Sequence, residues 1–263
     1  MVLWFVILLI FISGCTSSQK ITVTPIPKDV SSYSSEAVPD DPWAWDYDGL
    51  RGFNNWASLN PAYETCGNGN RQSPINLKWQ QPSPNNKLRI SYQPADVIIK
   101  NKGFTFSIDF VRPLVVYFDN REFQLESVEF HSPSEHQLSS KAFPIEIQMH
   151  HRSPNGLLIL SSFLAAGQKS SWFETFLKVA KSVEPNKTSE RLMFDPQNLL
   201  PSKLNYYQYS GSLTYPPCSE GVEWIVFNTP QQVSKKQILM LRDLMPINNR
   251  PIQPANDREI KNY

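Results

Sequence analysis

Short runs of alternating apolar and polar residues, punctuated by Pro, Asn and Gly, fill most of the chain after residue 40. Alternation with a period of two is typical of strands that bury one face. The expected strands are Lys87–Tyr92, Val97–Asn101, Thr105–Phe110, Leu114–Phe118, Arg121–His131, Phe143–His151, Leu157–Ala165 and Glu223–Phe227. Leu157–Leu164 is mostly apolar, which is typical of a strand buried on both faces.

Two segments have the apolar spacing of a helix instead. Ser234–Leu244 ends before Pro246, and Ser171–Val183 carries an apolar stripe. The stripe consists of Trp172, Phe176, Val179, Ala180 and Val183. With no repeat and no internal linker, the pattern predicts a single mainly-β domain over residues 41–263 with short peripheral helices.

Two of the expected strands carry a polar face opposite an apolar one. In Leu125–His131 the polar face consists of Ser127, Glu129 and His131, and in Ile145–His151 it consists of Glu146, Gln148 and His150. On one surface strand this would be ordinary alternation. Two such strands, sharing most of the histidines of the chain, indicate a cleft, and histidine with carboxylate is the donor set of a metal site.

Composition and charge narrow the classes of function. Of the 263 residues 40% are hydrophobic, which excludes a disordered chain, and the net charge of +1 gives no support for a nucleic-acid partner. All four histidines, His131, His136, His150 and His151, lie within 21 residues. Their clustering is the main chemical signal in the composition.

The first residues have the character of a targeting segment. Met1–Ile12 is an unbroken apolar run, about 18 Å long as a helix, which is too short for a bilayer core of about 30 Å but suits a signal peptide. Ser13-Gly14-Cys15 follows and resembles a bacterial lipoprotein signal, although no Lys or Arg precedes the apolar run. We predict a signal peptide over residues 1–14 and an exported protein anchored to the membrane by a lipid on Cys15; an uncleaved short anchor is the alternative.

Residues 15–40 are rich in Ser, Thr and Pro, which predicts a flexible tether behind the lipidated cysteine. Export would place the remaining cysteines, Cys66 and Cys218, in an oxidising compartment. A Cys66–Cys218 disulfide is therefore expected, with two free buried cysteines as the alternative.

Five ordered motifs between about Trp43 and Glu259 resemble the α-class carbonic anhydrases. They are Trp45-x-Tyr47 with Trp56, Gln72-Ser73-Pro74-Ile75-Asn76-Leu77, Phe130-His131-Ser132-Pro133-Ser134-Glu135-His136, Ser212-Leu213-Thr214-Tyr215-Pro216-Pro217-Cys218, and Asn249-Arg250-Pro251-Ile252-Gln253-Pro254. The resemblance implies a fold around a large, twisted, mostly antiparallel central sheet with a cleft at its centre. It also supports the disulfide, because bacterial members pair cysteines at these two positions.

The family binds zinc through three histidines, and the zinc acidifies the water that attacks carbon dioxide. In the frame of the resemblance, the three ligand positions fall on Glu129, His131 and Gln148, so two imidazoles are replaced. A carboxylate raises the pKa of a zinc-bound water, and an amide oxygen is a weaker zinc ligand than imidazole. His150 is a possible substitute ligand, although two residues along a strand displace it by about 6.6 Å. Zinc is therefore a possible but doubtful cofactor.

Alignment with the same family motifs shows which residues around the zinc site are retained and which are replaced. Thr214 and Glu135 match the hydroxyl and carboxylate that orient the zinc-bound hydroxide, and Glu146 matches the acid that orients the third ligand. Phe104 stands at the position of the proton-shuttle histidine, and a phenyl ring carries no proton.

Three hypotheses follow from these substitutions. The favoured one is an exported, carbonic-anhydrase-like lipoprotein that is catalytically impaired or inactive, with a retained cleft for a ligand or partner. The alternatives are an active zinc carbonic anhydrase with unusual ligands, which hydrates carbon dioxide to bicarbonate, and another metal-dependent hydrolase that uses Glu129, His131 and His150.

Overall fold

The computed structural model describes residues 44–84 and 86–263, which belong to one unit over Asp41–Tyr263. The predicted signal peptide, the lipidation site Cys15 and the tether lie outside the described residues, so they stay predictions. In the part of the chain that is described, no helix is both long enough and apolar enough to cross a membrane.

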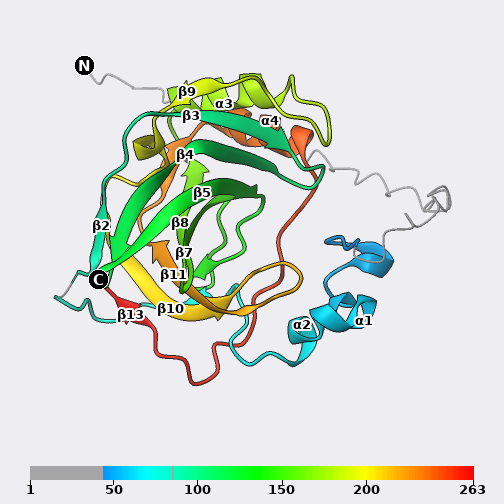
Figure 1. Ribbon diagram of the computed structural model, residues 1–263, viewed down its shortest axis with the longest axis vertical. Coiled ribbons are helices and arrows are strands. Elements are labelled where there is room, and N and C mark those ends of the chain that lie inside the picture. The colour runs from blue at the N-terminus through cyan, green and yellow to red at the C-terminus, as the bar shows by residue number, and fades with distance from the viewer. Residues whose placement is uncertain (1–43, 85) are drawn as a thin grey trace, which may run out of the picture. The chain divides into compact units, whose positions relative to one another are not determined.

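One large sheet organises the described residues (Figure 1). Within them, eleven strands pair in the order β13-β10-β11-β8-β7-β5-β4-β3-β9, with β2 beside β4 and β12 beside β8. The strands are β2 (Leu88–Ile90), β3 (Ala95–Asn101), β4 (Phe106–Phe118), β5 (Arg121–His131), β7 (Ile145–Ser153), β8 (Gly156–Ala166), β9 (Leu192–Phe194), β10 (Tyr206–Ser212), β11 (Glu220–Phe227), β12 (Gln231–Val233) and β13 (Lys261–Asn262). Only β11 and β12 run parallel to their neighbour β8, so the expected mainly-β class with a mostly antiparallel sheet is confirmed.

Most differences from the predicted strands lie in short or irregular elements. Strand β4 is continuous where two strands, Thr105–Phe110 and Leu114–Phe118, were expected, because a register shift between Asp109 and Leu114 accommodates Pro113. The expected strand Lys87–Tyr92 shortens to β2. Strands of two or three residues, including β1 (Asn76–Leu77) paired with β6 (Gln137–Leu138), are too short to show alternation in sequence.

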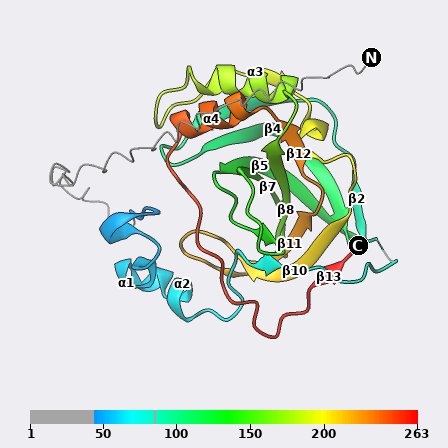
Figure 2. The same ribbon diagram turned by 180° about the vertical axis from the view of Figure 1, so that it is seen from behind.

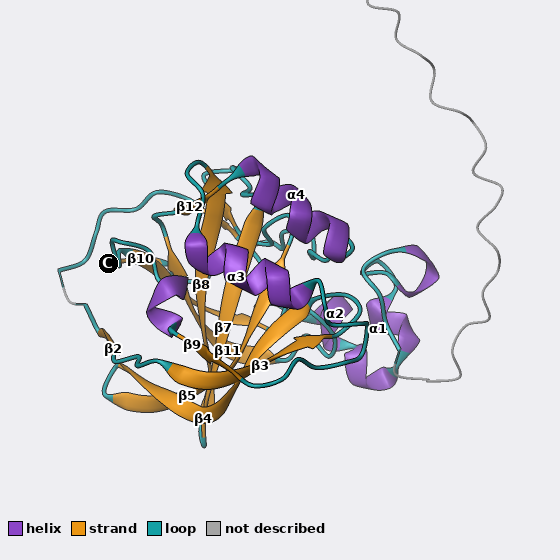
Figure 3. Ribbon diagram, turned by 90° about the horizontal axis from the view of Figure 1, so that it is seen from above, coloured by secondary structure: helices purple, strands orange, loops and turns teal. Residues whose placement is uncertain are grey.

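Two helices of ten residues each pack on one face of the sheet (Figures 2 and 3). Helix α3 (Ser171–Ala180) and helix α4 (Lys235–Leu244) begin after Ser170 and Ser234, whose hydroxyls accept hydrogen bonds from the first turn. The buried face of α3 consists of Phe173, Phe176, Leu177 and Ala180. It therefore differs from the expected stripe, since Trp172 and Val179 are only half-buried.

The apolar sides of β5 and β7 meet these helices. The Phe130 ring of β5 stacks on Phe176 of α3 with centroids 4.4 Å apart, and Ile147 and Met149 of β7 are fully buried in the same core. Because side chains alternate along a strand, this packing turns Glu129, His131, Glu146 and Gln148 to the opposite face. The apolar core thus determines where the polar groups of the site point.

The remaining helical elements are short, and one of them carries a cysteine of the predicted disulfide. Helix α1 (Trp56–Leu59) and helix α2 (Thr65–Asn68) are single turns, and 3-10 turns cover Gly49–Arg51, Pro61–Tyr63 and Pro196–Leu199. Cys66 of α2 is bonded to Cys218, which confirms the expected pairing. The disulfide ties α2 to the loop that carries Thr214 and Tyr215.

Candidate functional site

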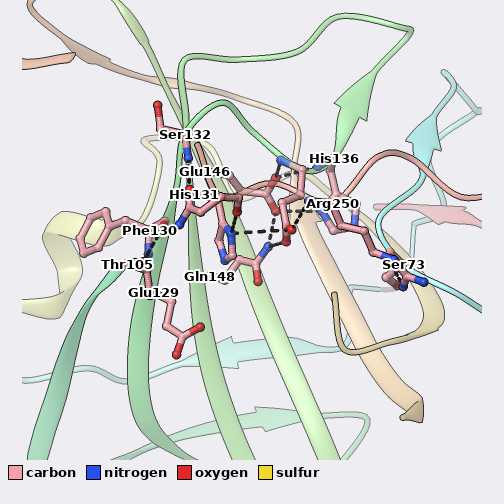
Figure 4. Close-up of polar contacts among 12 residues, drawn as sticks. Ser73, Thr105, Glu129, Phe130, His131, Ser132, His136, Glu146, Gln148 and Arg250 are labelled. Carbon is pink, nitrogen blue, oxygen red and sulfur yellow. Dashed lines mark hydrogen bonds and ion pairs between the residues drawn. The ribbon is translucent and has the colours of Figure 1, made fainter. Parts of the chain in front are cut away.

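The candidate site is built on the polar side of two adjacent strands, β5 and β7 (Figure 4). In their antiparallel register Glu129 lies opposite Gln148, and His131 lies opposite Glu146. All four side chains are at least 95% buried. Strand alternation had predicted this shared face, and the register brings the three candidate ligand positions Glu129, His131 and Gln148 together.

Glu146 is the centre of a buried hydrogen-bond network. Its Oε2 accepts the backbone N–H groups of Glu135 and His136 at 2.9 and 2.8 Å, and its Oε1 accepts His136 Nδ1 and Ser161 Oγ, both at 2.8 Å. Gln148 Nε2 is a further donor at 3.1 Å. Burial alone would raise the pKa of Glu146, but the contacts with His136 lower it to about 2. The carboxyl is therefore ionised and fully paired.

The same network fixes the side chain of Gln148. Its Nε2 donates to Glu135 Oε2 at 2.7 Å as well as to Glu146 Oε1, and both carboxylates can only accept. The amide nitrogen must therefore face the two acids, and the carbonyl Oε1 is left buried without a partner among the described residues. We call Glu135, His136, Glu146, Gln148 and Ser161 the inner network.

His131 is oriented by a distant loop. Its Nδ1 donates to the carbonyl of Asn248 at 2.7 Å, and its Nε2 is buried with no partner among the described residues. Burial would lower the pKa of His131, but the Glu135 carboxylate, 3.7 Å from Nδ1, and the Asn248 carbonyl raise it above its usual value. Burial in turn raises the pKa of Glu135, whose Oε1 accepts the backbone N–H of Arg250 at 2.9 Å.

Glu129 is paired with a lysine rather than with another member of the polar face. Lys102 Nζ lies 2.5 Å from Glu129 Oε1, and His150 Nε2 lies 3.8 Å from Glu129 Oε2. Burial would raise the pKa of Glu129, but His150 and Lys102 hold it below its usual value. We call Lys102, Glu129 and His150 the outer group. Sequence reasoning missed Lys102, although it stands in the same turn as Phe104.

Thr214 and Glu135, which match the hydroxyl and carboxylate of the family motif, are close together but not aligned for a hydrogen bond. Thr214 Oγ1 is buried and makes no well-formed hydrogen bond within the described residues. The hydroxyl is nevertheless near enough to Glu135 to lower the pKa of its carboxyl, although burial has the larger, opposite effect. The side chains of Glu135 and Thr214 are therefore neighbours, as the motif comparison predicts.

Aromatic side chains gather beside the site. The ring centroids of Phe104 and Trp45 are 5.1 Å apart. Tyr215 stacks on Trp45 with ring centroids 5.8 Å apart and an interplanar angle of 10°. Tyr47 contacts Trp45 and Phe104, and its hydroxyl is buried without a partner among the described residues. The position expected for a proton shuttle is therefore occupied by a phenyl ring, which is packed in an aromatic cluster and cannot itself carry a proton.

A cleft of about 510 Å³ opens over the outer group. Lys102, Glu129, His150, Arg152 and Tyr215 are on its lining, with Leu213 and Val222 on the apolar side. His131, Gln148 and Thr214 are not among the described residues that line it. The cleft therefore reaches Glu129 and His150, whereas the other ligand positions lie beneath its surface.

The other two histidines have structural contacts. His136 Nε2 lies 2.6 Å from the Tyr209 hydroxyl, which lies 2.8 Å from Ser73 Oγ. His151 is on the apolar face, 2.5 Å from the Tyr92 hydroxyl, and burial lowers its pKa to about 3. Both histidines therefore make contacts within the interior of the protein rather than with the cleft.

The donor set does not fit a zinc ion. Over residues 44–84 and 86–263 there is no group of three His, Cys, Asp or Glu side chains that could hold a metal ion. Glu129 is already paired with an ammonium, and the Gln148 amide is committed to two carboxylates. At the three ligand positions themselves, the buried atoms left without a partner among the described residues are His131 Nε2 and Gln148 Oε1.

Comparison with known proteins identifies the family. Residues 51–263 match the family model of the eukaryotic-type carbonic anhydrases. A carbonic anhydrase from Pectobacterium carotovorum is 34% identical over 82% of this chain and 89% of its own length.

Two solved structures are similar in fold as well as in sequence. One is the α-carbonic anhydrase of Thermovibrio ammonificans in complex with the inhibitor sulfanilamide, with a TM-score of 0.78, 34% identity, and coverage of 83% of this chain and 98% of that one. The other is a dioscorin complexed with ascorbate, with a TM-score of 0.76, 32% identity, and coverage of 84% and 98%. The chain therefore belongs to the α-class, or eukaryotic-type, carbonic anhydrase family.

Proposed function

We propose that this protein is an exported lipoprotein of the family that hydrates carbon dioxide poorly or not at all and uses its cleft to bind a small polar ligand. The observation that carries the proposal is that two of the three ligand positions hold side chains other than histidine, each already bonded to a neighbouring side chain. Gln148 donates its amide hydrogens to Glu135 and Glu146, and Glu129 is bonded to Lys102. Neither position presents an imidazole.

The physical reason for expecting little or no hydration is that zinc lowers the pKa of its bound water only if its ligands leave most of its positive charge in place. A zinc ion held by three neutral imidazoles brings the pKa of its bound water near 7, which supplies a nucleophile at neutral pH. Here only His131 supplies an imidazole at these positions, and the carboxylate at position 129 is already paired with the Lys102 ammonium. The residues present therefore do not support this chemistry, and no step of it is assigned to them.

The test is a paired measurement on the purified protein. We expect less than about one tenth of a zinc ion per chain by elemental analysis, and no carbon dioxide hydration above the uncatalysed rate with or without added Zn²⁺. One zinc per chain together with sulfonamide-sensitive hydration would overturn the proposal. It would favour the active-enzyme alternative, which the relatives named carbonic anhydrase support.

A double substitution sharpens this test. Glu129→His with Gln148→His restores three imidazoles on one polar face, whereas each single substitution restores only two. We expect the double variant to gain stoichiometric zinc and the single variants to gain little, because zinc affinity depends on the full donor set. Equal zinc content in all three variants would show that these positions do not form the donor set.

The ligand-binding part of the proposal rests on the cleft. Its volume of about 510 Å³ is within the usual range of small-molecule sites, and its lining combines charged side chains with Leu213, Tyr215 and Val222. The solved dioscorin complex contains ascorbate, which makes ascorbate a suitable first probe. Isothermal titration with ascorbate, and with glucose as a neutral control, measures whether a compound of this size binds; no heat with either would count against this class of ligand.

The export part rests on the first fifteen residues. The apolar run followed by Ser13-Gly14-Cys15 favours lipid attachment at Cys15 and a membrane-anchored location outside the cytoplasm. Mass spectrometry of the protein from a membrane fraction is expected to find an N-terminal, lipid-modified Cys15. An unmodified Cys15 would contradict the anchor without affecting the proposal for the cleft.

A metal-dependent hydrolase that uses Glu129, His131 and His150 is the second alternative. It is less well supported, because His131 lies beneath the cleft that exposes the other two. Hydrolysis of a p-nitrophenyl ester in the presence of Zn²⁺, abolished by His150→Gln, would favour it.

A further inference from the structure

Lys102 occupies a defined place on the wall of the cleft. Its backbone N–H donates to the carbonyl of Thr105 at 2.8 Å, and the next residue, Gly103, has a φ of +82° and donates its N–H to Asn101 Oδ1 at 2.9 Å. Asn101 in turn donates to the carbonyl of Val183 at 2.9 Å. The turn between β3 and β4 is therefore held at both ends, and it directs the lysine toward β5.

The ammonium meets a carboxylate that has no other strong donor. Lys102 Nζ lies 2.5 Å from Glu129 Oε1, and the Glu129 side chain is only 5% exposed. A buried carboxylate costs free energy unless a cation or several donors accompany it. Glu146, on the neighbouring strand, is accompanied by backbone and side-chain donors, whereas Glu129 depends on this one ammonium.

The second oxygen of Glu129 faces an unused imidazole. His150 Nε2 lies 3.8 Å from Glu129 Oε2 and has no hydrogen-bond partner among the described residues, and both side chains line the cleft. A carboxylate and an imidazole that face the same space are donors that suit Zn²⁺ or Co²⁺. Without the lysine, this pair would be a weak, two-donor binding site for a divalent cation.

We propose that Lys102 is the resident cation of the cleft, whose ammonium balances Glu129 and keeps divalent metal ions away from Glu129 and His150. This inference rests on the proposed function and deepens it, because it names the group that makes the cleft independent of a metal. Lys102 acts through Glu129 and is therefore a positioning and selectivity residue rather than a catalytic one.

The experiment compares four variants by their thermal unfolding temperature, Tm, with EDTA and with 1 mM Zn²⁺. Lys102→Met removes the charge and keeps the length of the side chain, Lys102→Arg keeps the charge, and Lys102→Met with Glu129→Gln removes both partners. Lys100→Met is the matched control, because Lys100 pairs with Asp109 at the same distance of 2.5 Å, but in a more exposed setting.

In EDTA we expect Lys102→Met to lower Tm by about 5 °C or more, because it leaves a buried carboxylate unpaired. The double variant should recover most of this loss, Lys102→Arg should lose little, and the control should lose about 2 °C or less. Zn²⁺ should raise Tm by a few degrees only in Lys102→Met, since binding to the folded state alone stabilises it. A structural role of Lys102 alone would not produce this response to the metal.

Two results would overturn the inference. One is a Lys102→Met protein as stable as wild type in EDTA, and the other is an equal Zn²⁺ response in wild type and Lys102→Met. If Lys102→Met does not fold, Lys102→Gln carries the same comparison. Failure of the proposed function is distinguishable, because it would appear as stoichiometric zinc and hydration in the wild-type protein, whatever the Lys102 variants do.

Discussion

Glu146 of the inner network and Glu129 of the outer group lie on the adjacent strands β7 and β5, yet the two carboxylates are compensated in different ways. Glu146 accepts hydrogen bonds from two backbone N–H groups and three side chains and is fully buried. Glu129 has one strong partner, Lys102, and faces a cleft. Glu146 therefore has several donors, and solvent does not reach it. Glu129 depends on a single ion pair that solvent and solutes can reach through the cleft.

The difference shows how one sheet tolerates two unusual residues at its centre. A glutamine at position 148 needs no new partner, because two carboxylates already stand ready to accept its amide hydrogens. A carboxylate at position 129 needs a cation, and the turn at Lys102 supplies it. Accordingly, perturbing the inner network should affect stability strongly, whereas perturbing the rim of the cleft should affect it weakly.

The largest effect is expected for Glu146→Gln. The substitution places an amide NH₂ where several donors converge, and removes the charge that they stabilise, so we expect a loss of about 3–5 kcal/mol in the free energy of unfolding. Urea denaturation followed by circular dichroism measures it. The matched control is Glu126→Gln on the exposed side of β5; similar losses in both variants would refute the distinction between the two regions.

The next largest effect is expected in the pH dependence of stability, to which the ionised Glu146 contributes. The pKa of Glu146 is lowered to about 2 in the folded protein, below the value near 4.5 of an unperturbed glutamate. A depressed carboxyl pKa contributes stability that is present above pH 4.5 and lost as the pH falls toward 2, on the order of 3 kcal/mol in all. Urea denaturation at pH 7, 4.5 and 3 should therefore give a steeper loss for wild type than for Glu146→Gln, and parallel slopes would contradict the assignment.

Sequence reasoning predicted most of the polar face but not its partners. Alternation in Ile145–His151 placed Glu146, Gln148 and His150 on one side of β7, because a buried strand imposes its period of two on every side chain. The disulfide followed from the cysteine count and the family resemblance. These are features that a strand or a motif carries within itself.

The missed features depend on contacts between distant segments. The Asn248 carbonyl that orients His131 is 117 residues away, and Lys102 reaches Glu129 from a turn whose sequence gives no sign of its target. Two strands were expected where β4 is continuous, because Pro113 lies at an exposed irregularity that the strand accommodates. No local pattern encodes these pairings, since the tertiary fold creates them.

Removing one hydroxyl tests how far the inner network extends. Tyr209 links His136 to Ser73, so Tyr209→Phe should cost about 1–2 kcal/mol by leaving both partners short of a hydrogen bond in a buried place. Tyr207→Phe is the control on the same strand, because the Tyr207 hydroxyl makes no hydrogen bond within the described residues. If the two variants are equally stable in urea, the network ends at His136.

The smallest effect is expected at the rim of the cleft. Arg152 Nε lies 3.1 and 3.0 Å from the two carboxylate oxygens of Glu126, but the two side chains are 62% and 48% exposed. Water screens such a pair, and ordering two long side chains costs entropy, so Arg152→Met should change the free energy of unfolding by less than about 0.5 kcal/mol.

The control for this prediction is the other arginine beside the site. Arg250 is almost fully buried and donates to Gln72 Oε1 and to the carbonyls of Ser73 and Cys66 at 2.8–2.9 Å, so Arg250→Met should be far more damaging. Urea denaturation of both variants measures the contrast. A loss at Arg152 comparable to that at Arg250 would mean that the rim stabilises the fold as much as the buried network, and the division into a structural interior and an adaptable cleft would have to be abandoned.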